Sequence, residues 1–264
     1  MPIISGMFGK FLFLGTGPSV GVPFIGCSCG VCTSSLSFNQ RLRPSGLFRI
    51  GEKTLLVDVG PDFRQQALKY KIDQLDGALL THTHYDHIAG IDELRVFYLK
   101  QNKPLPFLLS KESFEELKVR YYYLLQPSSP TSSLTAQLDM HILPKEQGDI
   151  DFLGVKIHYF SYFQGTMKVT GYRIGDFAYV SDIKEYGEEI FESLRGVRTL
   201  VVSALRDGPA KLMLSLDEAI AFSKKSGARS TWITHMNHEI DYDIVSRKLP
   251  SGIQLAYDGL EIEF

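Results

Sequence analysis

The chain of 264 residues is 44% hydrophobic and 22% charged, which provides enough apolar length to bury a core and excludes a disordered protein. Its formal net charge of -2 excludes a global positive field, so neither nucleic acid nor an acidic membrane surface is an expected partner. No run approaches the roughly 20 apolar residues of a membrane-spanning helix, and the apolar run at 11–14 is too short for a signal peptide. We therefore expect a soluble, cytoplasmic protein.

In the first half of the chain, strand and helix signals alternate. Short apolar runs predict strands at 10–14, 47–50, 54–57 and 78–80. The glycines at 15–21, after the first of these runs, either permit a tight turn or cradle a phosphate. Pro61 marks the start of a helix, and helical spacing predicts two more helices at 91–100 and 110–125.

The second half begins with a Ser/Pro-rich stretch at 126–140, which is predicted to be an exposed loop, with a lid as one interpretation. Apolar runs then predict strands at 155–163, 171–174, 177–180 and 199–203. A capping box formed by Ser215 and Glu218 opens a helix that ends at Gly227. No linker divides the chain, so the alternation predicts one α/β domain over residues 1–264.

The stretch LLTHTHYDHIAG at 79–90 contains three of the seven histidines. At the end of a strand, the period of two points His82 and His84 the same way, so two nitrogen donors share one target. Asp86 and His87 follow as the chain turns into the next helix, and they present an oxygen and a nitrogen to a second point beside the first. Solvated or core-satisfied histidines are the alternative, but chance produces H-x-H-x-D-H only about once in several thousand such chains. The pattern therefore predicts a site for two metal ions.

The three cysteines, Cys27, Cys29 and Cys32, all lie within the segment GCSCGVC. An odd number of cysteines cannot form a closed disulfide framework, and their clustering favours a bound metal. Small buried apolar side chains and redox-active thiols are the alternatives.

The H-T-H-Y-D-H motif at 82–87 resembles the signature of the metallo-β-lactamase fold hydrolases, and the resemblance covers nearly the whole chain. LLVDVGPD resembles the motif with an aspartate that orients the histidine ligands, here Asp58. YVSDIKEY and ITHMNHEIDY match the bridging carboxylate and the last metal histidine, and AYDGLEI resembles the closing strand of the family. The resemblance implies an α/β fold, a four-layer αβ/βα sandwich. It also implies one metal held by Asp86, His87, His235 and the bridging Asp182, and another held by His82, His84, Asp182 and one further residue.

A narrower resemblance concerns the segment GTGPSVGVPFIGCSCGVC, which is similar to the start of the phosphoribosyl 1,2-cyclic phosphate phosphodiesterases of the carbon-phosphorus lyase pathway and their relatives. In these proteins a C-x-C-x2-C loop and a late histidine bind a structural zinc. The corresponding ligands here are Cys27, Cys29, Cys32 and His238. Three thiolates and one imidazole make a closed tetrahedral zinc site, and the nearby His235 places both sites on one turn.

Two positions depart from the family pattern. Gln164 stands where the first metal takes a further histidine, and its carbonyl is a weaker ligand for zinc than imidazole, though better suited to manganese or magnesium. The first metal site is therefore expected to be weak or empty. Met213 stands where relatives carry a histidine that acts as general acid, and methionine cannot donate a proton. Lys211, Arg206 and Tyr242 are candidate replacements.

The resemblance implies a metal-dependent phosphodiesterase in which two zinc or manganese ions activate water, with Asp86 and Asp182 as catalytic carboxylates. Asp58 would fix the orientation of the histidines from behind. The branch suggests a small cyclic or nucleotide-like phosphodiester as substrate.

Three other functions remain as alternatives. RNA processing of the RNase Z type shares the metal motif, but the chain has no long basic insertion that would grip RNA. Lactam hydrolysis fits less well, because Asp86 at the second metal matches the phosphodiesterase pattern. A degenerate metal-binding protein with little turnover is suggested by Gln164 and Met213. Many relatives form dimers, so a homodimer also stays open, although the sequence contains no signal for an interface.

Overall fold

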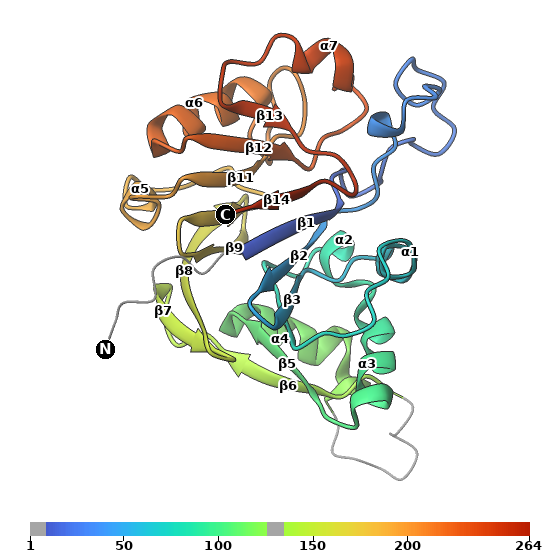
Figure 1. Ribbon diagram of the computed structural model, residues 1–264, viewed down its shortest axis with the longest axis vertical. Helices are drawn as coiled ribbons and strands as arrows, with labels where there is room; N and C mark the ends of the chain where they lie inside the picture. The colour runs from blue at the N-terminus through green and yellow to red at the C-terminus, as the bar shows by residue number, and fades with distance from the viewer. Residues whose placement is uncertain (1–8, 126–134) are drawn as a thin grey trace.

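The computed structural model describes residues 9–125 and 135–264. Two sheets of seven strands each pack face to face, and helices cover the outer face of each sheet (Figure 1). This arrangement is the four-layer αβ/βα sandwich that the sequence predicted. Sheets and helices with one apolar face reach this solution because each face is then buried against another element.

The first sheet contains the β-hairpin of the N-terminal half and a parallel section. Its strands are β1 (Gly9–Gly15), β2 (Ser45–Ile50), β3 (Lys53–Val57), β4 (Gly77–Leu79), β5 (Leu105–Leu109), β6 (Leu138–Ile142) and β14 (Glu261–Glu263). Their order is β14-β1-β2-β3-β4-β5-β6, with β3 to β6 parallel and the other pairs antiparallel. The residues after β3 and β4 therefore emerge side by side at one edge.

The second sheet repeats this plan in the C-terminal half. Its strands are β7 (Gln147–Phe152), β8 (Val155–Gln164), β9 (Met167–Ile174), β10 (Phe177–Val180), β11 (Thr199–Ser203), β12 (Ser230–Thr234) and β13 (Ile253–Leu255). Their order is β13-β12-β11-β10-β9-β8-β7, with β10 to β13 parallel and β7 to β10 antiparallel. Aromatic rings fill the space between the sheets; the ring of Phe11 lies 4.7 Å from that of Phe48 and 5.0 Å from that of Phe177.

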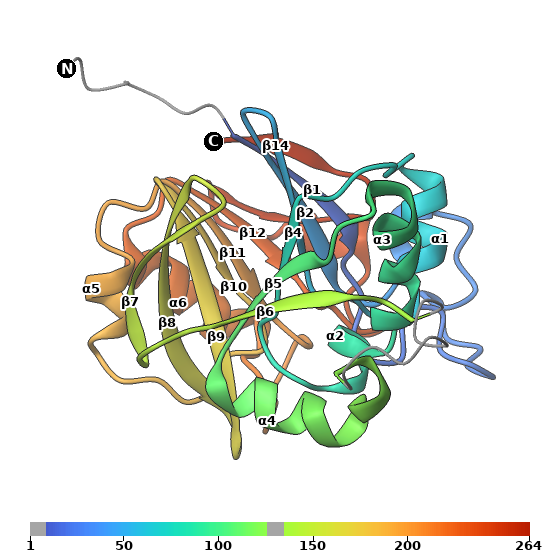
Figure 2. The same ribbon diagram turned by 90° about the horizontal axis from the view of Figure 1, so that it is seen from below.

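Helices form the two outer layers. The first sheet is covered by α1 (Phe63–Lys69), α3 (Arg95–Gln101) and α4 (Lys111–Arg120), and the second by α5 (Ile190–Ser193), α6 (Leu216–Ser226) and α7 (Tyr242–Ser246). Figure 2 views the molecule from the side of α3 and α4. The short α2 (Tyr85–Ile88) contributes Ile88 to the core beneath the helices of the first sheet. The 3-10 turns are η1 (Ser37–Asn39), η2 (Ile91–Leu94) and η3 (Tyr122–Leu124). Among the described helices, none has the length and apolar character to cross a bilayer.

The predicted boundaries of two helices and one loop need correction. The helix expected at 91–100 is divided into the 3-10 turn η2 and helix α3. The helix expected at 110–125 ends at Arg120, and η3 follows it. The loop expected at 126–140 is wrong at its end, because β6 begins at Leu138; its residues 126–134 lie outside the described part, so the lid interpretation stays a prediction.

The helix expected after residue 215 is present with its caps. The Ser215 side chain accepts a hydrogen bond from the Glu218 backbone N–H, and the Glu218 carboxylate accepts one from the Ser215 N–H. Gly227 ends the helix with a φ of 74°, the left-handed conformation in which glycine has no steric penalty. This capped helix forms one wall of the core behind the second sheet.

Candidate metal centre

Three residues of the site lie just after strands and have an uncommon backbone conformation. Asp58 follows β3, Asp182 lies two residues beyond β10, and His235 follows β12. Their φ angles are 59°, 54° and 61°, in the left-handed region that costs a non-glycine residue about 1–3 kcal/mol. Such conformations persist where the surrounding packing determines them, and they concentrate at functional sites.

Gly60 lets the loop after β3 lie directly against α2. A Cβ atom at this position would stand 2.1 Å from the backbone oxygen of Asp86, so only glycine fits. Beside it, the backbone N–H of Val59 donates to the carbonyl of His87 over 2.7 Å. These contacts therefore fix the position of α2, which carries the candidate ligands Asp86 and His87, relative to the end of β3.

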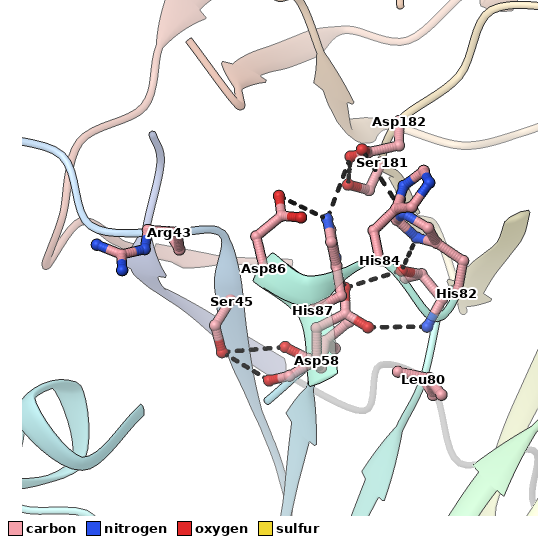
Figure 3. A network of polar contacts seen from close by, with 12 residues as sticks. Arg43, Ser45, Asp58, Leu80, His82, His84, Asp86, His87, Ser181 and Asp182 are labelled. Carbon is pink, nitrogen blue, oxygen red and sulfur yellow. Dashed lines mark hydrogen bonds and ion pairs between the residues drawn. The ribbon is translucent and has the colours of Figure 1, made fainter. Parts of the chain in front are cut away.

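His87 is the centre of the buried network drawn in Figure 3. Its Nδ1 atom lies 2.7 Å from Oδ2 of Asp58, and its Nε2 atom points the other way, 3.4 Å from Oδ2 of Asp86 and 3.6 Å from Oδ1 of Asp182. Asp58 also accepts hydrogen bonds from the backbone N–H and the hydroxyl of Thr81, at 2.8 and 2.9 Å. Asp58 thus contacts a histidine from behind, in the position that the sequence predicted.

The remaining predicted ligands converge on the same place. His235 Nε2 lies 3.3 Å from a carboxylate oxygen of Asp86 and 3.3 Å from one of Asp182. The other carboxylate oxygen of Asp182, Oδ2, lies 3.7 Å from His82 Nε2. The same oxygen accepts a hydrogen bond of 3.2 Å from the Gln164 amide nitrogen. These contacts bring together six of the residues predicted as metal ligands, His82, Asp86, His87, Gln164, Asp182 and His235.

Burial and neighbouring charges shift the pKa values of the ionisable groups of the centre. Burial by itself would raise the pKa of Asp182 and Asp86, but the adjacent His87 and His235 outweigh it and hold both values well below the usual range. Burial lowers the pKa of His82 well below its usual range. Both carboxylates are therefore anionic at neutral pH and available to a cation.

Unpartnered buried atoms show that the donor set suits metal ions. Within the described residues, His87 Nε2, both ring nitrogens of His235 and Gln164 Oε1 are buried without a hydrogen-bond partner. Each such atom costs about 1–3 kcal/mol unless something binds it. The donor atoms of His82, His87 and Asp182 lie within 4.8 Å of one another, and so do those of Asp86, His87 and His235. Imidazole and carboxylate donors are typical of zinc and manganese sites.

His84 belongs to neither of these two groups of donors. Its Nδ1 atom nevertheless lies 2.9 Å from Nε2 of His82, and the two rings meet edge to face. Both follow β4 in an extended segment rather than inside a strand.

A cavity of about 560 Å³ opens above the centre. His84, Asp86, Asp182 and His235 form its floor. Its walls come from the loop after β1, from α2, from the β8–β9 turn and from the segment between β11 and α6. The described lining contains no lysine or arginine.

Asp58→Asn is expected to weaken metal binding about 10- to 100-fold, the usual effect of losing a carboxylate that orients a histidine ligand. An amide in this place cannot stabilise the partial charge that His87 acquires on coordination. Asp258→Asn is the control, because Asp258 is a partly buried carboxylate that accepts its hydrogen bonds from Thr16 and Leu42. Titration of the metal-free variants with zinc measures the effect; equal affinity in Asp58→Asn and wild type would contradict the orienting role.

Gln164→His is expected to raise the metal content of the chain at limiting zinc. The carbonyl oxygen of Gln164 is buried without a partner near Asp182, and imidazole is a better zinc ligand than an amide oxygen. Gln164→Leu, which has no donor, is the control. Elemental analysis after dialysis decides the matter, and an unchanged metal content in the histidine variant would refute a ligand position at residue 164.

A second cluster lies in the loop between β1 and β2. His238 Nδ1 lies 3.3 Å from the sulfur of Cys27, 3.6 Å from that of Cys29 and 3.5 Å from that of Cys32. Tetrahedral zinc, with bonds of about 2.3 Å to sulfur and 2.0 Å to nitrogen, separates such donors by roughly 3.6 Å. Phe24 stacks on the His238 ring at 3.9 Å. The four residues predicted from the sequence therefore form a geometry that fits zinc.

Two further histidines, His158 and His141, lie outside the described groups of metal donors. Their ring nitrogens are 2.9 and 3.0 Å from carboxylate oxygens of Asp149 and Asp139. The three residues considered as replacements for a general acid, Lys211, Arg206 and Tyr242, do not line the cavity, whereas Met213 does. The sequence did not predict that Thr81 donates hydrogen bonds to Asp58 or that Gly60 allows close contact with α2, because it contains no separate signal for either contact.

Comparison with known proteins agrees with this geometry. Residues 53–236 match the family described as the β-lactamase superfamily domain, and the chain belongs to this superfamily. Together with the fold and the gathered ligands, this makes the protein a hydrolase of the metallo-β-lactamase fold. Within this class it is similar to a crystal structure described as a new diphosphatase from the PhnP family, with a TM-score of 0.90, 34% identity and 98% of both chains covered.

Two further comparisons extend the picture. The chain is 32% identical to an octanoyltransferase of Porphyromonas gingivalis over 262 residues, which is 96% of this chain and 51% of that protein. It thus spans about half the length of this relative. The zinc-bound PqqB of Methylobacterium extorquens has a TM-score of 0.76 at 18% identity, covering 97% of this chain and 100% of that one, and shows the shared fold.

Proposed function

We propose that the protein is a metal-dependent phosphodiesterase that hydrolyses a small cyclic or nucleotide-like phosphodiester. The observation that carries this proposal is the gathering of histidine nitrogens and aspartate oxygens at the floor of one open cavity. Two zinc or manganese ions held there would supply a nucleophile at neutral pH by lowering the pKa of water and would polarise a phosphoryl oxygen.

The residues of the chain have separate tasks in this proposal. The carboxylate of Asp182 contacts His82 of the first group and His235 of the second, so it would balance the positive charge of metal ions held by either group. Asp86 would orient the attacking water from the side of α2. Asp58 fixes the ring of His87, so its Nε2 atom stays directed at the centre.

The cavity supports a small substrate. Its volume of about 560 Å³ falls in the usual range for small-molecule sites. The activity named for the 34% identical PhnP family protein also concerns phosphorus–oxygen bonds. RNA processing has less support, because the chain has a net charge of -2 and the described lining carries no basic side chain.

The octanoyl transfer named for the P. gingivalis relative concerns a protein about twice as long as the matched part. Octanoyl transfer through a covalent acyl-enzyme would require an activated nucleophile in the cavity. The described lining contains no cysteine or lysine, and the three cysteines surround His238 instead. We therefore do not extend octanoyl transfer to this chain.

Hydrolysis of bis-p-nitrophenyl phosphate tests the proposal. The assay compares the protein as purified, the protein after removal of metal, and the metal-free protein after addition of Zn²⁺ or Mn²⁺. We expect hydrolysis in every state except the metal-free one. His235→Ala should abolish turnover, whereas His158→Ala removes a histidine outside the centre and serves as control. Metal binding without turnover in any of these states would instead support a degenerate metal-binding protein.

A further inference from the structure

Residues 81–84, between β4 and α2, include His82 and His84 and belong to no strand or helix. Because this segment lacks the hydrogen-bond ladder of a sheet, its conformation depends on bonds to neighbouring elements. At Thr81, just before His82, the backbone N–H and the hydroxyl donate to Asp58. Thr83, between the two histidines, is instead bound by side chains of helix α4.

Glu116 and Arg120 of α4 bind Thr83 at two points. The Thr83 hydroxyl donates to Oε2 of Glu116 over 2.5 Å, and the Thr83 carbonyl accepts a hydrogen bond of 2.5 Å from Nη1 of Arg120. Nη2 of Arg120 lies 2.8 Å from the same Glu116 oxygen, so the three residues form a closed ring of contacts. Thr83 is fully buried, and among the described residues only Arg120 donates to its carbonyl. Loss of this donor would therefore favour a shift of the segment that gives the carbonyl another partner.

The ion pair between Glu116 and Arg120 does not by itself explain this arrangement. An exposed pair four residues apart on a helix contributes little to stability. The same helix has a second pair, Glu115 and Lys118, also at 2.8 Å, and the side chain of Lys118 is 47% exposed against 45% for Arg120. In the described part of the chain, the side chains of the second pair form hydrogen bonds only with each other. The two pairs therefore differ mainly in the contact with Thr83.

We propose that Glu116 and Arg120 are positioning residues that direct the imidazole of His82 at the candidate metal centre. They act through Thr83, whose peptide unit continues directly from His82 and whose carbonyl and hydroxyl they hold in place. This inference rests on the proposed function, because it requires a metal ion at the centre. It assigns a task to two residues of the outer helical layer that touch no metal ligand themselves.

The consequence should be largest at the first group of donors, which contains His82. Gln164, whose amide nitrogen donates to Asp182, has only a carbonyl oxygen to offer an ion there, and this is a weaker ligand for zinc than imidazole. Affinity at the first group therefore depends on an imidazole that is directed well. Asp86 and His235 of the second group lie outside residues 81–84, so that group should change little.

Titration with Mn²⁺ tests the inference, after dialysis that removes metal from the centre and with electron paramagnetic resonance to count the free ion. The cysteine cluster competes little, because thiolates favour zinc and Mn²⁺ favours oxygen donors. His82→Ala identifies the ion that depends on His82. Arg120→Ala should raise the Kd of this ion about tenfold, the lower end of the range for lost contacts behind metal ligands, and leave any other ion unchanged. Glu116→Gln keeps an acceptor for the Thr83 hydroxyl and should lose less affinity than Glu116→Ala.

Lys118→Ala is the matched control and should change no Kd. In the His82→Ala protein, Arg120→Ala should have no further effect on the remaining ion, because both substitutions act on the same group of donors. An unchanged Kd in Arg120→Ala, an equal loss for every bound ion, or the same loss in Lys118→Ala would overturn the inference alone. Absence of Mn²⁺ binding by the wild type would overturn the metal centre, and with it both the proposed function and the inference.

Discussion

Asp182→Asn is expected to reduce kcat/KM for bis-p-nitrophenyl phosphate by about 1,000-fold, which corresponds to about 4 kcal/mol of lost transition-state stabilisation. The carboxylate of Asp182 lies 3.3 to 3.7 Å from nitrogens of His235, His87 and His82, so it contacts members of both groups of donors. A neutral amide would leave the positive charge of two ions poorly balanced. Elemental analysis of the same variant should show a loss of bound metal.

Asp149→Asn is the matched control for this substitution. Asp149 also contacts a histidine, His158 at 2.9 Å, but on β7 and with 87% of its side chain exposed. We expect wild-type turnover and metal content for this control. Full activity of Asp182→Asn with both ions still bound would show that the bridging carboxylate is not needed for the reaction.

The architecture was accessible from the sequence because its strongest signals are local. The apolar runs of β1, β3, β8 and β11 are strands, and the capping box marks the start of α6. The edge strand β7 was missed because its sequence QGDIDF contains two aspartates and a glycine, residues with low strand propensity that an exposed edge tolerates. The polar run near 126–140 concealed β6 for a related reason, since Asp139 and His141 lie on a partly exposed strand that only its pairing with β5 defines.

The candidate site was predicted in its membership but not in its geometry. The motif at 82–87 contains four donors within one segment, and the resemblance added Gln164, Asp182 and His235 from the second half of the chain. The left-handed backbone of Asp58, Asp182 and His235 has no sequence signal, because aspartate and histidine occupy this region only where tertiary packing imposes it. For Gln164, the residue type suggested a weak ligand, and only the structure shows that its amide nitrogen donates to Asp182 while its oxygen is buried without a partner.

The cysteine cluster also connects to the catalytic half of the molecule. His238 lies three residues beyond His235, and the backbone N–H of Met236 between them donates to the carbonyl of Thr16. The same loop continues to Ser19, which lines the cavity, and then to the cysteines. Arg41, at the end of this loop, donates to the carbonyls of Asn237 and Ile240 at 2.9 and 2.7 Å. Disturbing the cluster should therefore also disturb the cavity.

Substitution of any one of the three cysteines by alanine is expected to lower the free energy of unfolding by more than about 4 kcal/mol. Losses of this size are typical when a substitution removes a structural metal site. For a chain of this size that corresponds to a fall in Tm of roughly 10 °C, which thermal unfolding measures. The prediction distinguishes a zinc site from buried apolar thiols, because Cys32 is 8% exposed whereas Cys27 and Cys29 are only partly buried. If packing were the whole contribution, only Cys32→Ala would be costly. A zinc site requires nearly equal losses at all three positions, each with loss of bound zinc, while Ser28→Ala in the same exposed turn should change neither quantity.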